Sequence, residues 1–275
     1  MIFASDLDRT LIYSDKFLED MSEDEVRLIE KKGEQEISFM TETAIDLLKD
    51  LSENILFVPV TTRTIAQYRR IKLFQNEIVP KYAVVSNGGN LLIDGEIDLQ
   101  WNQQIHNRIA TECLPFEDVL TRFQEIQSDE WVLNKRMADD LFSYCIVDRK
   151  KVPMDDLMSF TDWLTQHNWK ASLQGRKLYF VPQCVSKGDA LDYIQERESI
   201  DFVAAAGDSL LDLPMLHMAD YAIAPPHGEI NQIYEEESLA IESILFTEKE
   251  GILAAEEILE RVQEFAERYP LVTTI

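Results

Sequence analysis

Short apolar runs alternate with amphipathic stretches along much of this chain, and this alternation limits the fold more than any other feature. The runs are rich in β-branched residues and have the length of buried strands. They span residues 2–5, 55–60, 82–85, 202–206 and 221–224. Helical patterns follow at 41–52, 65–74, 187–197, 210–218 and 249–268. The chain is therefore predicted to form an α/β fold, a doubly wound parallel sheet with its site at the carboxyl ends of the strands.

Residues 87–184 have a different pattern. They contain a hairpin signal around Asp94-Gly95, a helical stretch spanning Pro115, a helix at 154–167 and all four tryptophans. Strand candidates lie at 131–137, 142–147, 169–173 and 177–181. We expect a smaller α/β domain over 87–184, inserted into a core made of 1–86 and 185–275. A separate hairpin is predicted at 25–40, around Lys32-Gly33.

Two carboxylates and a hydroxyl follow the first predicted strand. Asp6 and Asp8 are separated by one residue, so their side chains leave an extended segment on the same side, and Thr10 follows them. One carboxylate can attack phosphorus while the other moves a proton. On these residues alone, the alternative that Asp6 and Asp8 cap a turn and Thr10 starts a helix stays open.

A second acidic run follows the fourth predicted strand, with Asp208 and Asp212. Unpaired carboxylates at neighbouring strand ends repel one another unless a cation lies between them. Mg²⁺ suits this setting because it takes oxygen ligands and keeps waters and substrate phosphate. Lys187 begins a predicted helix and Thr61 ends a predicted strand, so an ammonium and a hydroxyl are available for a phosphate group.

The ordered set Asp6-x-Asp8-x-Thr10, Thr61, Lys187 and Gly207-Asp208-x-x-x-Asp212 resembles the four motifs of the haloacid dehalogenase (HAD) superfamily. The long segment between the second and third motifs resembles the branch with a large α/β cap there. That branch includes Cof-like sugar phosphatases, sucrose-phosphate phosphatase and mannosyl-3-phosphoglycerate phosphatase. The resemblance implies a Rossmann-like HAD core and a cap that determines substrate specificity.

The resemblance also implies a role for each matching residue. Asp6 would be the nucleophile and Asp8 the general acid/base, with Thr61 and Lys187 binding the transferring phosphoryl group. Mg²⁺ would be held by Asp6, by the backbone carbonyl of Asp8 and by Asp208, with Asp212 as a ligand or as support for one. Substrate contacts are expected from the residues beside these motifs, namely Thr10, Thr62, Arg63, Asn87 and Gly88.

Three residues beside the motifs depart from the superfamily pattern. Arg9 and Thr62 stand where relatives often have glycine, and Leu211 stands where many have asparagine. None of them removes a group that does the chemistry, but all three lie beside the catalytic groups and weaken any close substrate analogy. Arg9 and Arg63 are candidates for contacting an anionic substrate, and each has the alternative of a solvated or paired arginine.

Composition excludes several classes of protein. The net charge of −25 argues against a nucleic-acid partner, since such proteins carry basic surfaces. No apolar stretch has the length of a membrane span and no signal peptide precedes the first strand, so no membrane partner is expected. The odd number of widely spaced cysteines predicts reduced thiols, which fits a cytoplasmic protein.

The sequence therefore predicts a Mg²⁺-dependent hydrolase of the HAD type. Its expected substrate is a small soluble phosphorylated metabolite, a sugar phosphate above all, cleaved through an aspartyl-phosphate intermediate. Two alternatives stay open, because the same residues serve them: phosphoryl transfer or mutase chemistry to a second hydroxyl, and non-hydrolytic binding of a phosphometabolite. The protein is expected to act as a monomer or homodimer.

Overall fold

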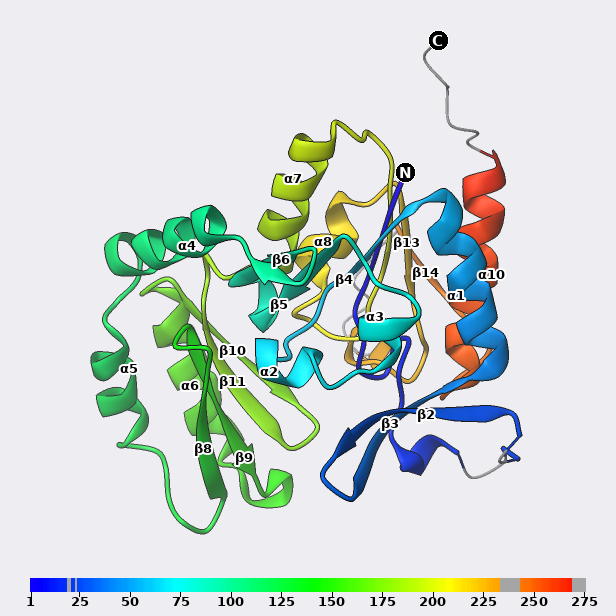
Figure 1. Ribbon diagram of the computed structural model, residues 1–275. Helices are drawn as coiled ribbons and strands as arrows, with labels where there is room; N and C mark the ends of the chain where they lie inside the picture. Colours follow the sequence, from blue (N-terminus) through cyan, green and yellow to red (C-terminus); the bar gives the residue numbers. More distant parts are fainter. Residues whose placement is uncertain (19–20, 23, 233–242, 269–275) are drawn as a thin grey trace. The chain divides into compact units, whose positions relative to one another are not determined.

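The chain forms two compact units. The computed structural model describes residues 1–18, 21–22, 24–232 and 243–268. The first unit comprises Met1–Ile97 and Lys187–Ile275, and the second comprises Asp98–Ser186. Figure 1 labels many of the helices and strands of each unit. Within the described residues, no helix is long and apolar enough to cross a membrane.

A five-stranded parallel sheet forms the centre of the first unit. Its strands are β1 (Ile2–Ser5), β4 (Leu56–Pro59), β12 (Val203–Ala206), β13 (Tyr221–Ala224) and β14 (Ile244–Phe246), in the order β14-β13-β12-β1-β4. β1, β4, β12 and β13 coincide closely with the predicted strands, whereas β14 was not predicted. Pro59 pairs with Ser5 at the end of β4, while the amide N–H of the next residue, Val60, donates to the Ser5 carbonyl. Successive amides of a strand point in opposite directions, so the nitrogen of Pro59, which carries no hydrogen, faces away from β1.

β5 (Tyr82–Val85) departs from the prediction of a parallel strand. It pairs antiparallel with β6 (Asn90–Ile93), which pairs in turn with β7 (Glu96–Ile97). A single parallel bridge between Val60 and Val84 connects β5 to the end of β4. The connection from β5 to β6 is too short for a crossover, so an antiparallel return is required. This hairpin lies in the first unit, whereas the sequence analysis placed residues 87–97 in the second domain.

Helices lie on both faces of the parallel sheet. α1 (Glu42–Asn54) and α10 (Leu253–Arg268) pack side by side on one face, while α7 (Lys187–Glu198) and α8 (Leu213–Met218) pack together in the other layer (Figure 1). Burial of apolar side chains such as Leu48 and Ile258 against Phe3 and Phe57 explains the positions of α1 and α10. The doubly wound arrangement predicted from the sequence is confirmed.

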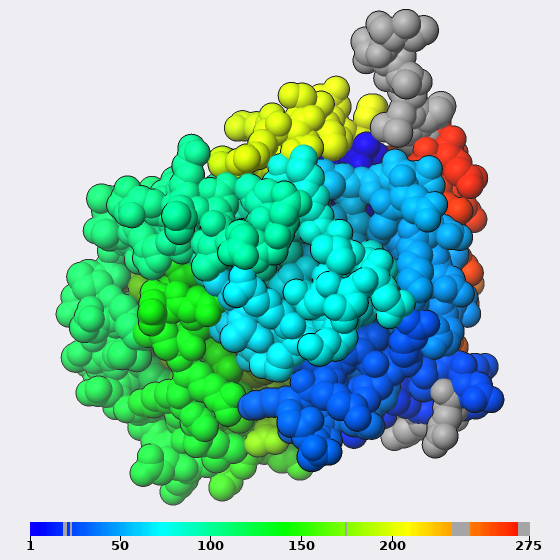
Figure 2. All heavy atoms as spheres, in the orientation of Figure 1, coloured from blue at the N-terminus to red at the C-terminus, as the bar shows by residue number. Residues whose placement is uncertain are grey.

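The predicted helix at 65–74 is instead two short helices, α2 (Ile65–Tyr68) and α3 (Leu73–Asn76). Between them, Ile71 forms a bridge with Glu30, and the Lys72 amide donates to the Ile29 carbonyl over 2.8 Å. Both partners belong to β2 (Val26–Lys32), which forms the predicted hairpin with β3 (Gln35–Thr41). Figure 2 shows the hairpin, coloured blue, on the surface of this unit beside the cyan segment that carries α2 and α3.

The second unit combines an antiparallel sheet with helices. The strands β8 (Val132–Ala138), β9 (Phe142–Val147), β10 (Trp169–Gln174) and β11 (Lys177–Pro182) lie in the order β10-β11-β9-β8. The helices are α4 (Leu99–Glu112), α5 (Phe116–Phe123) and α6 (Met154–Thr165). The stretch predicted as helical across Pro115 is broken there, because proline suits a helix start but not an interior. Phe123, Phe160 and Phe180 form part of its own core.

Candidate active site

Two neighbouring strands of the parallel sheet end in carboxylates. β1 and β12 are paired so that Ser5 lies beside Ala206, and the Asp6 amide extends this ladder by donating to the Ala206 carbonyl over 2.8 Å. Asp6 directly follows β1, and Asp208 follows β12 after Gly207. The register of the sheet, rather than a long loop, therefore brings these two parts of the chain together.

Lys187 links the acidic residues. Its Nζ lies 2.6 Å from Asp6 Oδ1 and 2.5 Å from Asp212 Oδ1, and the lysine is only 1% exposed. Burial alone would lower the pKa of Lys187, but the charges of Asp212 and Asp6 outweigh that effect and raise it above its usual range. The ammonium is therefore held in its charged form at the centre of the site.

The loop after β12 is organised around Asp212. Its Oδ2 accepts hydrogen bonds from the amides of Asp208 and Ser209, over 3.1 and 2.9 Å, and from the Ser209 hydroxyl over 2.8 Å. A Cβ at Gly207 would lie 2.5 Å from Asp212 Cβ, so only glycine fits there. A Cβ at Gly228 would lie 2.5 Å from the Asp208 carbonyl oxygen. The sequence analysis missed Ser209 and Gly228, which fix the position of Asp208.

Three buried carboxylates face one another in this site. Each of Asp6, Asp208 and Asp212 offers an oxygen within 4.8 Å of the others. Burial raises the pKa of Asp6 to about 7 against the opposing charge of Lys187, and the Asp212 and Asp8 carboxylates add to the increase. Burial, with Asp6 and Asp212, raises the pKa of Asp208 well above its usual range. Lys187, with Arg9 3.7 Å from Asp208, supplies two positive charges against three carboxylates, so the donor set fits an added hard cation with oxygen ligands.

Asp8 lies in a different environment from Asp6. The Arg63 guanidinium holds it in a two-pronged contact, with Nε 2.7 Å from Oδ2 and Nη2 2.7 Å from Oδ1. The Asp8 side chain is 46% exposed, whereas that of Asp6 is 8% exposed. A buried carboxylate thus lies beside a positioned, accessible one, so the two groups have different environments.

A buried glutamate of the hairpin supports Arg63. Glu30 Oε2 accepts from Arg63 Nη1 over 2.5 Å and from the Ser38 hydroxyl over 2.9 Å, while Oε1 accepts from Arg70 Nε over 2.9 Å. The Glu30 side chain is fully buried. Glu30 was not predicted from the sequence, because the pairing of β2 is irregular between Leu28 and Lys31. The regular alternation of inward and outward side chains along a strand therefore does not hold there.

Replacement of Glu30 by glutamine is expected to lower kcat by about 10- to 100-fold with KM changed less than about twofold. Arg63 loses a charged partner, so the Asp8 carboxylate is held less accurately, and small misplacements of a general acid/base, the role expected of Asp8, cost about this much. Steady-state kinetics with a phosphomonoester measure the effect. Glu36→Gln on the same hairpin is the control, because Glu36 is exposed and pairs with Lys31 over 3.5 Å. Equal kinetics of Glu30→Gln and Glu36→Gln would contradict the positioning role.

The remaining predicted residues lie around this centre. The Thr10 hydroxyl is 3.5 Å from Asp6 Oδ2, and the Thr61 hydroxyl is fully buried and accepts from the Arg63 amide over 3.1 Å. The main-chain N–H of Asn87 donates to the Thr61 carbonyl over 2.9 Å. Ser86, Asn87 and Gly88 all have positive φ, and this left-handed turn holds the end of β5 against the Thr61 loop. Thr62 is partly exposed.

Arg9 is a paired residue. Its Nη2 donates to the His227 carbonyl over 2.6 Å, and its Nε lies 3.7 Å from Asp208 Oδ2. Arg9 itself has φ 68°, a left-handed conformation that explains why relatives often have glycine there. The His227 Nδ1 accepts from the Gly251 amide over 3.1 Å, so Nε2 carries the proton and donates to the Arg9 carbonyl over 2.9 Å. Arg9 thus contributes positive charge beside Asp208.

Sequence comparison identifies the protein family. The family described as sucrose-6F-phosphate phosphohydrolase matches residues 1–265. The chain belongs to this family. It is accordingly a phosphatase of the HAD superfamily, and the resemblance seen in the four motifs is confirmed. No curated protein matches the sequence at a significant level.

Solved structures share the fold over nearly the full length. The sucrose-phosphatase of Synechocystis sp. PCC6803, solved with sucrose and phosphate, has 15% identity and a TM-score of 0.71, covering 96% of this chain and 97% of its own. The HAD subclass IIB sugar phosphatase BT4131 has 11% identity and a TM-score of 0.61, with 96% and 98% covered. A trehalose-6-phosphate phosphatase related protein has 15% identity and a TM-score of 0.54, with 98% and 100% covered.

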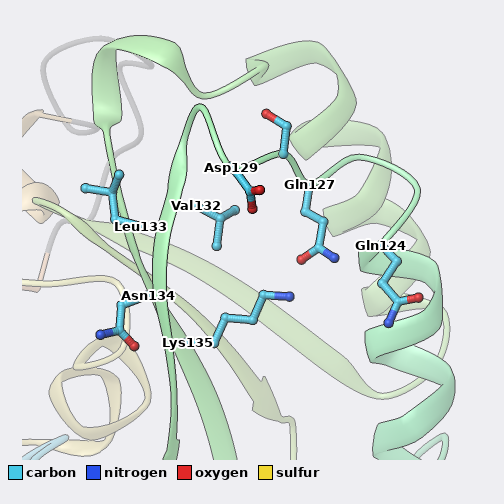
Figure 3. A pocket seen from close by; sticks show the side chains of 8 residues that line it. Gln124, Gln127, Asp129, Val132, Leu133, Asn134 and Lys135 are labelled. Carbon is cyan, nitrogen blue, oxygen red and sulfur yellow. The ribbon is translucent and has the colours of Figure 1, made fainter.

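The second unit of this HAD phosphatase carries exposed cations on both faces of its sheet. Arg136 is paired in register with Tyr144, which is next to Tyr179 in the sheet. Lys135 lies on the opposite face, with its Nζ 5.8 Å from the centre of the Phe123 ring. Figure 3 shows Lys135 extending from β8 toward Gln127, along a polar pocket of about 460 Å³. Arg136 and Lys135 therefore lie on opposite faces of the sheet.

Proposed function

We propose that this protein is a Mg²⁺-dependent phosphatase of a small soluble phosphomonoester, a sugar phosphate in particular, and that it works through an aspartyl phosphate on Asp6. The observation that carries the proposal is the buried contact of Lys187 with Asp6 and Asp212, beside the Arg63-bound carboxylate of Asp8. Family membership supports phosphatase chemistry, and the sugar phosphatases among the solved structures support the substrate class.

The proposed reaction has two steps. An oxygen of Asp6 attacks phosphorus, and the bond to the leaving alkoxide oxygen breaks as Asp8 donates a proton to it. Asp8 then takes a proton from water, the water oxygen attacks phosphorus, and Asp6 leaves as a carboxylate. Lys187 and the Thr61 hydroxyl hold the phosphoryl oxygens while negative charge develops on them. Arg63 keeps Asp8 in position through both steps.

The carboxylates fit Mg²⁺, which we propose as the cofactor. Asp6 and Asp208 would be ligands, together with the Asp8 backbone carbonyl. Asp212 is better suited to supporting them, because Oδ2 accepts three hydrogen bonds and Oδ1 contacts Lys187. When bound, the ion supplies positive charge that neutralises the phosphate oxygens and the buried carboxylates.

Thermal stability is expected to respond to Mg²⁺ more strongly at high pH. The folded-state pKa of Asp6 and of Asp208 is raised above the unfolded value, so their contribution to stability is present at low pH and lost as pH rises. For Asp6, whose pKa is raised to about 7, the loss occurs near neutral pH. Mg²⁺ binds the ionised carboxylates, and saturation at a hundredfold above Kd would add about 2.7 kcal/mol. Melting temperatures with Mg²⁺ and with EDTA should therefore differ more at about pH 8 than at about pH 5.5.

Asp208→Asn is the matched control for this measurement, because it removes one charge and one proposed ligand without changing the size of the side chain. The variant should lose most of the Mg²⁺-dependent increase in melting temperature. An increase that is the same at both pH values, or that persists in Asp208→Asn, would contradict the proposed metal site.

We further propose that the second unit selects the substrate with the sheet face that carries Tyr144, Tyr179 and Arg136. The Tyr144 and Tyr179 rings lie 5.5 Å apart, and Lys177 Nζ lies 5.9 Å from the Tyr144 ring centre. Aromatic rings beside cations suit a polar, hydroxylated ligand. Residues on this face are the proposed contacts for the sugar part.

Arg136→Ala is expected to raise KM for the preferred substrate by about 10- to 150-fold, because a lost charge-assisted hydrogen bond costs ~1.5–3 kcal/mol. Lys135→Ala is the matched control, since Lys135 is the preceding residue in β8, is also exposed and lies on the other face. Steady-state kinetics of both variants decide the matter. A larger increase in KM for Lys135→Ala than for Arg136→Ala would contradict the proposal, because it would indicate that the substrate contacts the opposite face of the sheet.

The test of the proposed function is phosphate release from a panel of phosphorylated sugars, polyols, nucleotides and cofactors, with Mg²⁺ and with EDTA. The expected result is Mg²⁺-dependent release that is strongest for one or a few sugar phosphates. Release at the same rate in EDTA would contradict the role of Mg²⁺, and a preference for nucleotides would contradict the substrate class.

A further inference from the structure

Two cysteines of the second unit lie in contact although they are far apart in the sequence. Cys113 caps the end of α4 and Cys184 follows β11, and their Sγ atoms are 3.9 Å apart. Neither belongs to the proposed catalytic machinery. Cys113 is partly exposed and Cys184 is buried. One thiol is therefore open to a reagent in solution while the other is protected directly behind it.

Hydrogen bonds to one turn hold both cysteine segments in place. The Asn168 carbonyl accepts the Gln183 amide over 2.8 Å and the Cys113 thiol over 3.2 Å. The Asn168 side-chain amide donates to the Glu112 carbonyl over 2.5 Å, and the Leu114 amide donates to the His167 carbonyl over 3.2 Å. The residues next to each cysteine are thus bonded to the same turn, so the contact between the thiols follows from the fold of this unit.

The two thiols differ in reactivity. The hydrogen bond with Cys184 lowers the pKa of Cys113, and the same interaction raises the pKa of Cys184. A thiolate is the nucleophilic form of cysteine, and Cys113 is also the partly exposed member of the pair, so Cys113 is the group that meets a reagent first. Cys145, in the core of the same unit, has its pKa raised to about 11 by burial. The three cysteines therefore consist of one reactive thiol, one adjacent thiol and one inert thiol.

We propose that Cys113 and Cys184 form a redox modification site that takes peroxides and converts reversibly into an intramolecular disulfide. The Cys113 thiolate attacks one peroxide oxygen, the O–O bond breaks, and a sulfenic acid forms on Cys113 with release of hydroxide, or alkoxide from an organic peroxide. Cys184 sulfur then attacks Cys113 sulfur, the S–O bond breaks, and water leaves with the Cys184 proton. Two thiols are oxidised by two electrons, and the peroxide is reduced.

The test is limited oxidation of the native full-length protein with hydrogen peroxide, followed by thiol counting in denaturant and by peptide mapping. The thiol count should fall from three to one, with Cys113 and Cys184 joined and Cys145 still reduced. A dithiol reductant should restore all three. Before oxidation, alkylation of Cys113 at neutral pH should be at least about tenfold faster than that of Cys145.

Cys184→Ser and Cys145→Ser make the test specific. In Cys184→Ser, the Cys113 sulfenic acid should persist and be trapped by dimedone, whereas Cys145→Ser should form the disulfide as the parent does. Three unreacted thiols, oxidation of Cys113 to sulfinic acid in the parent without a disulfide, or a bond that includes Cys145 would each overturn the proposal. Phosphate release plays no part in this readout, so the outcome is independent of the proposed function.

Discussion

Asp6→Asn is expected to lower kcat for phosphomonoester hydrolysis by about ten-thousandfold or more, because the amide cannot attack phosphorus and the remaining site supplies only binding and charge. The fold should survive, since Asn retains the size of the side chain and the main-chain bond to Ala206 is unaffected. Loss of one of the facing carboxylates also reduces their mutual repulsion. Phosphate release under saturating substrate, together with thermal melting, measures both effects.

Asp94→Asn is the control for Asp6→Asn. Asp94 lies exposed in the β6–β7 turn with φ 50°, where asparagine is equally suited to the backbone. Its kcat should equal that of the parent. Parent-like turnover in Asp6→Asn would remove Asp6 from the role of nucleophile, whatever the behaviour of the rest of the site.

Lys187→Met is expected to abolish measurable hydrolysis and to lower the free energy of unfolding by about 3–5 kcal/mol, the cost of removing one partner of a buried ion pair. The lysine is the closest positive charge to Asp6 and Asp212, at 2.6 and 2.5 Å. Without it, the buried carboxylates repel one another, and the remaining cation, Arg9, lies beside Asp208 only, at 3.7 Å. Denaturant unfolding in EDTA measures the loss.

The loss in Lys187→Met should shrink as pH falls, because protonation of the remaining carboxylates removes the repulsion. Lys81→Met serves as the comparison, since Lys81 pairs with Glu198 over 2.8 Å at the surface and its side chain is 47% exposed. An exposed pair of this kind contributes at most ~1 kcal/mol. Equal losses in the two lysine variants would contradict the structural importance assigned to Lys187.

The proximity of Asp6, Asp208 and Lys187 was predictable because each of these residues lies at or next to the end of a regular element. Asp6 follows β1, and Asp208 follows β12 after one glycine, so strand periodicity and the parallel register fix both positions. Lys187 begins α7, a helix whose pattern was clear in the sequence. Local signals of this kind need no information about distant contacts.

The residues that the sequence did not reveal depend on irregular or long-range pairing. Glu30 faces inward because the pairing of β2 with β3 is irregular at this position. Its bridge with Ile71 divides the helix predicted at 65–74. β5 turns back into a hairpin with β6 instead of joining the parallel sheet as a full strand. In each case a tertiary contact overrides a local pattern that was correctly recognised.

The most direct test of the account is the mass of the Asp8→Asn variant after rapid acid quenching with Mg²⁺ and p-nitrophenyl phosphate. The p-nitrophenolate leaving group of this substrate needs no proton, so Asp6 should still be phosphorylated. Loss of the Asp8 base should slow hydrolysis of the intermediate. We predict one phosphoryl group on Asp6, labile to hydroxylamine and absent from the double variant that also carries Asp6→Asn. Release of p-nitrophenol and phosphate together, with no phosphorylated Asp6 at any quench time, would contradict the account.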